Sequence, residues 1–432
     1  MEVNLQRASW RAAVLGVALA AAAVVISQAG TLWLSNHRTN SEEADVVERG
    51  VALTPGDAEA WDRLGRLQQW DMEKGGPSQA IAAYQKAVHV NPLWAHYWLD
   101  LASAEEDAGD PAAARQAFAR AHDVYPASAE VAFYYGNFLL RQGEYDEAYK
   151  ELSRAVNSDS RLLPPAISRA WRASGDVHAL LNRMLPRDAN AYFEALDFFS
   201  TIHEAEPALV VWHSLVTLGQ PIALPRTFPF FEELIREDRS EEARRAWQEA
   251  RRAASMFGEE PANGSLVWNG NFQEDFAEGG LDWRWDAPLG ASIDFDNAPA
   301  PNESRAIRLE FGGGSNVALD APFQYVPVQP NRTYHFRGYL RAAEISTESG
   351  IRFQITDPNH NGAVSVLTDD LVGTRPWTAA EADLTTPSDT HFLLIRVVRL
   401  PSRLFENRLS GTAWVADVSL VPHTPAAGQG SR

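Results

Sequence analysis

The chain has 432 residues, a formal net charge of −19 and no cysteine. This length allows two or three domains of ordinary size. The absence of cysteine excludes disulfides, zinc–thiolate sites, iron–sulfur clusters and cysteine nucleophiles. The negative charge argues against nonspecific binding to nucleic acid, which requires a basic surface.

The N-terminal region contains an uncharged, apolar run from Ala12 to Leu34. A helix of about 20 such residues is long enough to cross a bilayer. Arg7 and Arg11 precede the run, and Trp10 and Trp33 lie near its two ends. Because basic residues favour the cytoplasmic side and Trp favours the membrane interface, the pattern predicts a transmembrane helix with its N-terminus inside.

These features predict a cytoplasmic segment over residues 1–11, a transmembrane helix over 12–34, and a bulk that lies in the periplasm or outside the cell. The expected location is the bacterial inner membrane. A cleaved signal peptide is the competing interpretation, because Ser27-Gln28-Ala29 has small residues at the spacing of a cleavage site. The apolar run continues past that site to Leu34, which favours an uncleaved anchor.

A repeat with a period of 34 residues follows, marked by Pro92 and Pro126. It divides the sequence into three units, 58–92, 93–126 and 127–160. Each unit carries large and small apolar residues on a first helix and a spaced Ala–aromatic–Ala or Ala–Leu–Ala pattern on a second. In the second unit these residues are Trp98, Leu101, Ala102, Ala114, Phe118 and Ala121.

These positions resemble the tetratricopeptide repeat consensus, a stacked helical hairpin. The glycines between the two helices, Gly109 and Gly143, permit a tight reversal, and the terminal prolines end the second helix. Because one hairpin cannot bury its own apolar face, several must stack. The first unit has a longer turn near Glu73 to Gly76, and residues 42–55 match only a second helix, which would join the membrane helix directly to the array.

The repeat pattern becomes divergent over 161–228 and returns in a last unit over 229–257, so the whole helical domain is expected over 42–257. In the tetratricopeptide family such arrays form a superhelix whose first helices line a groove that binds protein partners. The residues predicted to line this groove are Arg63, Tyr97, Asp100, Tyr134, Asn137 and Arg141. Phe133, Tyr134 and Tyr135 cannot all face inward on one helix, so at least one should point into the groove.

Helical periodicity stops after a turn-rich linker at 258–264. Short apolar or alternating runs then follow, separated by Gly, Pro, Asn and Asp, which predicts an antiparallel β-sandwich over 265–422 and a disordered tail over 423–432. The expected strands are 305–309, 323–328, 333–340, 350–355, 377–384, 391–398 and 412–420. The predicted fold class is therefore a transmembrane helix, an α-solenoid and a β-sandwich.

Four segments of this β region resemble the carbohydrate-binding-module jelly roll of the galactose-binding-like group. They are Leu266 to Phe272, Leu281 to Trp285, Tyr334 to Ala342 and Gly411 to Leu420. The resemblance implies glycan contacts by exposed aromatic rings, for which the residues proposed are Trp283, Trp285, Tyr325 and Trp377. It also implies a structural calcium, for which Glu274 and Asp417 are the possible ligands; the opening Glu of the motif is replaced by Gln273. These aromatic residues could instead belong to the core.

The sequence contains no phosphate-binding loop, nucleophile elbow or histidine-based metal motif, and no cofactor is expected beyond that calcium. The interpretation is a membrane-anchored scaffold, not an enzyme. It would bind protein through the repeats and glycan through the β domain, in assembly or export of a cell-surface polysaccharide. A protein-only adaptor with a structural β domain is the alternative. A glycoside hydrolase would need an acidic pair across an open cleft.

Overall fold

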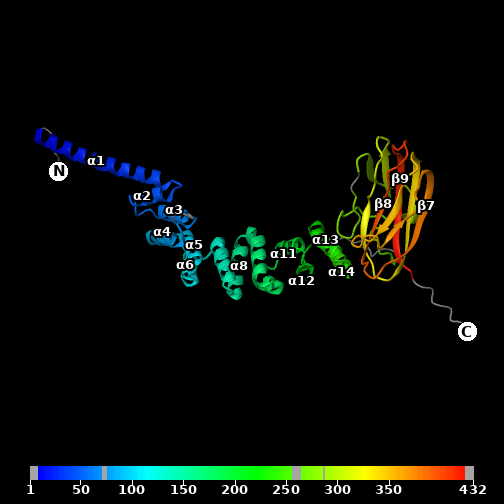
Figure 1. Ribbon diagram of the computed structural model, residues 1–432, viewed down its shortest axis with the longest axis horizontal. Coiled ribbons are helices and arrows are strands. Elements are labelled where there is room, and N and C mark those ends of the chain that lie inside the picture. Colours follow the sequence, from blue (N-terminus) through cyan, green and yellow to red (C-terminus); the bar gives the residue numbers. More distant parts are fainter. Residues whose placement is uncertain (1–7, 71–74, 255–263, 286–287, 424–432) are drawn as a thin grey trace. The chain divides into compact units, whose positions relative to one another are not determined.

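A computed structural model describes residues 8–70, 75–254, 264–285 and 288–423. In these ranges helices α1 to α14 come first and strands β1 to β9 follow, as expected from the sequence (Figure 1). The chain divides into two compact units, unit 1 at residues 1–186 and unit 2 at residues 187–432. The predicted linker at 258–264 and the predicted tail lie almost wholly outside the described residues.

Unit 1 contains the helices that the repeat period predicts. Pro77 and Pro111 occupy the first turns of two second helices, where a missing N–H costs nothing. Gly109 and Gly143 adopt the left-handed conformation with φ of 82° and 77°. The helices are α1 Ala8–Thr39, α2 Ala44–Val51, α3 Ala58–Trp70, α4 Pro77–Val90, α5 Ala95–Asp107, α6 Pro111–Val124, α7 Ala129–Arg141, α8 Tyr145–Ser158, α9 Leu163–Ser174 and α10 Val177–Ala179.

Small residues allow the paired helices of unit 1 to approach closely. A Cβ added to Gly65 would lie 2.6 Å from the Tyr84 ring, and one added to Gly136 would lie 2.8 Å from Leu152. The repeat alanines of the second helices are fully buried, among them Ala80, Ala114 and Ala148. Substituting larger residues at these positions would separate the helices, because the interior is already close-packed.

Helix α1 is long and apolar enough to cross a membrane, with a mean hydropathy of 2.1 over 18 residues and none of that window buried. A signal sequence would meet the same criteria. Its C-terminal end packs against α2, which folds back along it (Figure 1). There the Ser35 hydroxyl donates to the Gly50 carbonyl at 3.0 Å and lies 2.5 Å from the Thr54 hydroxyl. The predicted half-repeat is thus a hairpin whose first helix is the end of α1.

Unit 2 begins with four helices, α11 Ala189–Thr201, α12 Ala205–Thr217, α13 Phe228–Arg236 and α14 Ser240–Ala253. Aromatic rings join the last three of them: Trp212 stacks on Phe230 at 5.3 Å, and Phe231 meets Trp247 edge-on at 5.2 Å. Such pairs stabilise beyond the area they bury.

Two antiparallel sheets follow in unit 2. The five-stranded sheet has the order β1-β2-β9-β4-β7, and the four-stranded sheet has the order β3-β8-β5-β6. Two strands, β1 and β6, were not expected from the sequence. The strands are β1 Ala291–Asp296, β2 Ala306–Gly312, β3 Phe323–Pro327, β4 Thr333–Ile345, β5 Arg352–Thr356, β6 Ser365–Leu367, β7 Gly373–Thr385, β8 Phe392–Val398 and β9 Ser410–Pro422.

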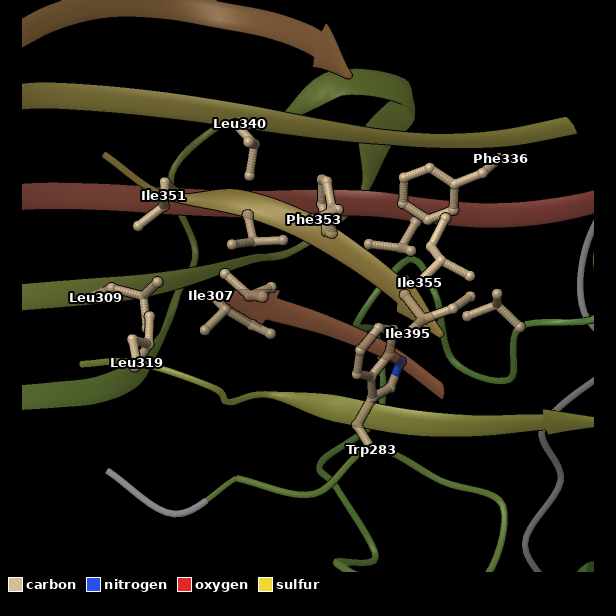
Figure 2. Packing of buried hydrophobic residues seen from close by; sticks show 14 of the residues in the cluster. Trp283, Ile307, Leu309, Leu319, Phe336, Leu340, Ile351, Phe353, Ile355 and Ile395 are labelled. Atoms are coloured by element: carbon tan, nitrogen blue, oxygen red, sulfur yellow. The ribbon is translucent and has the colours of Figure 1, made fainter. Parts of the chain in front are cut away.

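One hydrophobic core lies between these sheets. Figure 2 shows Phe336 and Leu340 of β4 pointing toward Phe353 and Ile355 of β5, from the opposing sheet. Along β4 buried and more exposed residues alternate, as they must where one face of a strand packs on a core. Trp283 closes one end of this core (Figure 2).

The last helical pair packs directly on the β region. A Cβ on Gly280 would lie 2.2 Å from the Trp247 ring, and Arg251 donates to Glu274 at 2.8 Å. Asn359, in a β-region turn, donates to the Ile235 carbonyl at 2.7 Å. Helices α11 to α14 therefore belong to the same compact unit as the sheets.

Candidate protein-binding groove

A cavity of about 800 Å³ opens in unit 1, lined by residues of α5, α6, α7 and α9. Its apolar part is formed by Leu99, Phe118 and Leu140. These side chains come from successive helical pairs, which the 34-residue period brings onto one side of the stack. The cavity is therefore a candidate for the predicted groove.

Four of the six predicted groove residues line this cavity: Asp100, Tyr134, Asn137 and Arg141. Tyr134 is 49% exposed, while its neighbour Phe133 is buried and meets it edge-on at 6.1 Å. Tyr134 is therefore the member of the aromatic triplet that faces the groove. It offers a ring face to an incoming side chain and a hydroxyl to a polar group.

The other two predicted residues do not line the cavity. Tyr97 is only 8% exposed and packs near Trp94, with 6.4 Å between ring centroids. The Arg63 guanidinium donates to the backbone carbonyls of Asn40 and Ser41 at 3.3 Å and 3.1 Å. It therefore ties α3 to the turn between α1 and α2.

The charges around the cavity are divided between its two sides. Asp100, Glu106 and Glu130 contribute carboxylates from α5 and α7, and Arg169 and Arg172 contribute guanidinium groups from α9. Arg141 and Glu106 form a two-bond ion pair, with both donor–acceptor distances 2.7 Å. This pair neutralises the middle of the groove and leaves an acidic end and a basic end.

The two arginines of α9 have no carboxylate within 4 Å among the residues that the structure describes. Arg169 lies over the Phe133 ring at 4.8 Å, and Arg172 donates to the Ser168 hydroxyl at 2.8 Å. Both side chains are exposed. Two unpaired guanidinium groups at one end of a cavity are suited to bind carboxylates, which they can contact with two hydrogen bonds each.

Two polar groups in or beside the groove are poorly satisfied. Asn137 is 3% exposed, and its amide donates to the Phe133 carbonyl while its own oxygen has no partner in the described part of the chain. Behind the groove, burial and then the neighbouring Asp100 raise the pKa of Asp62 to about 8. Arg66 partly offsets this effect from 3.1 Å. The two carboxyl groups lie close enough that ionisation of Asp100 disfavours ionisation of Asp62.

The structure contradicts the proposed role of Trp283 in sugar binding. Its ring is fully buried between the sheets and packs against Phe272, with ring centroids 5.4 Å apart. A buried ring has no face to stack on a sugar. The sequence could not show this, because a sandwich core and a sugar platform both use Trp in similar loop and strand positions.

Two of the remaining proposed aromatic residues are engaged in packing. Trp285 lies between Phe276 and Phe295, at 4.9 Å and 5.0 Å. Tyr325 lies under the Arg284 guanidinium at 5.1 Å, where Arg284 also pairs with Glu232 of α13.

Trp377 is half-buried, as Trp285 and Tyr325 are, but it belongs to β7 at the edge of the five-stranded sheet. Its indole N–H has no partner among the described residues.

The geometry also does not support the calcium site suggested by the sequence. Glu274 is bound to Arg251, and Asp417 accepts a hydrogen bond from Asn302. No group of three or more His, Cys, Asp or Glu side chains in the described residues is arranged to hold a metal. Calcium needs several oxygen ligands at once, whereas Glu274 already pairs with Arg251 at 2.8 Å.

Sequence reasoning missed the residues that give the groove its charge pattern. Glu106 and Glu130 are absent from the predicted groove residues, and Arg169 and Arg172 lie in the segment where the repeat pattern becomes divergent. The available signal was the spacing of three between the two arginines, which places both on one face of a helix.

Two family models, each described as tetratricopeptide repeat, match residues 71–129 and 106–161. A curated relative, the type IV pilus assembly protein PilF of Pseudomonas aeruginosa, is 30% identical over 136 residues. The match covers 32% of this chain and 52% of PilF, so the chain spans about half the length of that relative. Residues 71–161 therefore contain tetratricopeptide repeats, as the sequence predicted.

Solved structures resemble both parts of the chain at low scores. A crystal structure of MamA is 16% identical, covers 40% of this chain and 85% of its own, and has a TM-score of 0.27. A structure titled "CBM4 structure and function" is 16% identical, covers 36% and 99%, and also has a TM-score of 0.27. The xylan-binding CBM22-1 domain of Paenibacillus barcinonensis Xyn10C is 15% identical, covers 36% and 92%, and has a TM-score of 0.25.

Proposed function

We propose that this chain is a membrane-anchored, extracytoplasmic scaffold that binds an extended segment of a partner protein in the groove of unit 1. The observation that carries the proposal is the pair of unpaired guanidinium groups, Arg169 and Arg172, beside an apolar floor of Leu99, Phe118 and Leu140. This arrangement fits a segment with an apolar side chain in its middle and a carboxylate toward α9. Tetratricopeptide repeats are protein-binding modules, and no catalytic role is proposed.

The anchor in this proposal is α1. Its apolar span, its flanking Arg11 and its terminal Trp33 support insertion with the N-terminus in the cytoplasm of a bacterium. Ser35 and Thr39 are buried against α2, so the end of α1 also serves as a helix of the array. Cleavage after Ala29 would leave this packing intact but would remove the anchor.

The class of assembly that the scaffold serves has two candidates. The first is assembly or export of a cell-surface polysaccharide, in the periplasm or outside the cell. The second is a protein-only adaptor of a membrane complex, with a structural β region. The similarity of the repeats to a pilus assembly protein supports the second, and so does the burial of Trp283.

A photocrosslinking amino acid at Tyr134, in the full chain expressed in its own cell, tests the groove. We expect a discrete protein adduct that disappears when Arg169 and Arg172 are both changed to Glu, because the reversed charge repels the carboxylate end of the bound segment. The measurement is the adduct band and its identification by mass spectrometry. Both arginines are exposed, so circular dichroism should show unchanged helix content.

The matched control is Arg161→Glu, a charge reversal at an arginine whose side chain is 88% exposed and pairs, among the described residues, with Asp159 alone. This variant should leave the Tyr134 adduct unchanged. An adduct at Tyr134 that survives the double reversal would contradict the proposal, as would one lost equally in the Arg161 variant.

The polysaccharide candidate depends on Trp377, the half-buried ring of the edge strand β7. If the β region binds glycan there, affinity electrophoresis of the full chain in a gel containing the host's surface polysaccharide should show retardation. Trp377→Ala should abolish it, because the sugar loses its stacking surface. If the wild type and Trp377→Ala migrate equally with and without polysaccharide, the polysaccharide candidate is excluded and the protein-only adaptor is the remaining candidate.

A further inference from the structure

The two edges of the helical array in unit 1 differ sharply in polarity. The turns that lead from a second helix to the next first helix lie on one edge, because consecutive helices run antiparallel. Two of these turns, residues 52–57 and 91–94, carry Leu53, Leu93 and Trp94, and Asp57 is the one charged residue in them. We call this edge, defined by those three residues, the apolar edge.

The side chains of the apolar edge are open to solvent. Leu93 is 80% exposed, Trp94 is 53% exposed and Leu53 is 36% exposed. A single exposed apolar residue needs no explanation, but a set on successive turns of one edge is unusual for a surface that faces only water. The turns are also well fixed: the Trp61 indole donates to Pro55 and the Trp98 indole to Pro92, at 3.0 Å and 2.9 Å.

The opposite edge, formed by the turns within each hairpin, is acidic. Glu42 and Glu43 lie in the turn between α1 and α2, and Asp107 and Asp110 flank the turn between α5 and α6. All four are exposed. The contrast between the edges is therefore not a general property of loops in this chain.

The apolar edge lies on the same side of the array as the apolar span of α1. Helix α2 runs back along α1, so the turn after α2 returns to the level of Ser35, the residue after the predicted span. The hydrogen-bond distance of 2.5 Å between the Ser35 and Thr54 hydroxyls fixes this position. Leu53 is thus adjacent to the point where α1 would leave a membrane, and the turn of Leu93 and Trp94 follows two helices later on the same edge.

The third turn of the series, residues 125–128, is also uncharged and carries an exposed Tyr125, and the fourth carries Asp159 and Arg161. A bilayer at the end of α1 can be reached only by the turns nearest to that end, and these are the turns that carry Leu53, Leu93 and Trp94.

From these observations we infer that Leu53, Leu93 and Trp94 insert into the interfacial layer of the same membrane that holds α1. This inference rests on the proposed anchoring by α1. Trp prefers the headgroup level of a bilayer, and exposed Leu beside it gains from burial in the acyl boundary. The two contacts together would hold the array against the membrane, with its acidic edge directed away from anionic lipid headgroups.

The absence of cysteine makes a direct test possible. Single-cysteine variants of the full chain, Leu19→Cys, Leu93→Cys and Asp110→Cys, are labelled with an environment-sensitive NBD fluorophore. They are then reconstituted in vesicles of phosphatidylethanolamine and phosphatidylglycerol. Quenching by doxyl-labelled lipid reports contact with the bilayer, and quenching by iodide reports contact with water.

We expect doxyl-lipid quenching and blue-shifted emission at positions 19 and 93, and iodide quenching only at position 110. A probe at 93 that is as accessible to iodide as the probe at 110, while position 19 is in lipid, overturns the inference and leaves the anchor standing. A probe at 93 protected from both quenchers also overturns it, because the contact is then with protein. If position 19 remains aqueous, the anchor and the inference fail together.

Discussion

Helix α6 in unit 1 and helix α14 in unit 2 carry the same pattern, an aromatic residue between two buried alanines. In α6 the aromatic residue is Phe118, and in α14 it is Trp247; both are nearly inaccessible to solvent. Phe118 nevertheless forms part of the cavity wall in unit 1. Trp247 is instead covered by the Gly280 turn of the β region, with which it is in close contact.

This difference shows what the repeat pattern specifies. The Ala–aromatic–Ala pattern determines how a second helix packs on the first helix of its hairpin. It does not determine which part of the chain, or which ligand, covers the remaining surface of that hairpin. In unit 1 the neighbouring surface is a charged groove open to a ligand. In unit 2 the corresponding space is filled by another part of the same chain and sealed by ion pairs such as that between Arg251 and Glu274. A repeat near the end of an array can therefore be structural, while a central one is left free to bind.

The largest expected effect that tests this comparison is that of Trp247→Ala. Removing a fully buried indole leaves a cavity between α13, α14 and the Gly280 turn, and such changes cost about 3–5 kcal/mol. Differential scanning calorimetry of the full chain in detergent should show a lower melting transition for unit 2 and an unchanged one for unit 1.

Trp70→Ala is the matched control, because Trp70 is 75% exposed and its loss creates no cavity. It should leave both transitions in place. If Trp247→Ala lowered the transition of unit 1 by the same amount, the two units would unfold together, and the contrast between a free and a covered repeat would not hold.

The second expected effect concerns Asp282, which is fully buried near the junction of α14 and the β region. Burial, opposed by hydrogen bonds from the Ala277 and Trp283 backbone, raises the pKa of Asp282 to about 6 from an ordinary value of 3.8. Because the folded state prefers the protonated form, this group stabilises unit 2 fully below pH about 4, and that contribution is lost as the pH rises through 6. The shift corresponds to about 3 kcal/mol.

Comparison with Asp282→Asn isolates this contribution from the other carboxylates. The free energy of unfolding of each protein is measured by denaturant titration at pH 4 and at pH 8. Relative to the wild type, the free energy of unfolding of the variant should be about 3 kcal/mol higher at pH 8 than at pH 4. A difference that stays constant over this range would show that Asp282 keeps an ordinary pKa.

Much of the fold follows from local sequence signals. Pro92, Pro126 and the repeated alanines predict the helical pairs because a 34-residue period leaves few other arrangements. The strands of 323–328 and 391–398 were predicted because their residues are apolar and β-branched. Strand β1 was missed because its sequence, ASIDFD, carries two Asp, and β6 because it has only three residues.

The site was less predictable, because it depends on contacts between distant segments. Tyr134 and Arg141 could be placed from their position in a repeat. Arg169 and Arg172 could not, because their helix departs from the consensus. Trp283 was misplaced because nothing in a single sequence distinguishes a ring that closes a core from one that faces solvent. Its burial depends on Phe272 and Phe276, whose own positions require the assembled sheets.

The smallest of these effects is expected from Gly136→Ala, which tests how closely a free repeat is packed. A methyl group at Gly136 would meet Leu152 at 2.8 Å, and forcing extra volume into a packed interior costs about 1–3 kcal/mol. The transition of unit 1 should fall and that of unit 2 should not. Gly56→Ala is the control, because a Cβ there meets nothing within 4 Å.

A second variant shows whether Leu152 is the cause. Leu152→Ala makes room for the added methyl group, so the double variant should be less destabilised than the sum of the two single variants. Additive effects would instead place the strain in the α7 backbone.

At the junction of α14 with the β region, a second substitution could not offset the cost of Gly280→Ala in the same way, because Gly280 has a φ of 59° as well as its contact with Trp247. Making room beside Trp247 would not remove the free-energy cost of a left-handed backbone conformation at an alanine. Close packing in unit 1 is therefore a matter of side-chain volume, whereas at the junction in unit 2 it is also a matter of backbone conformation.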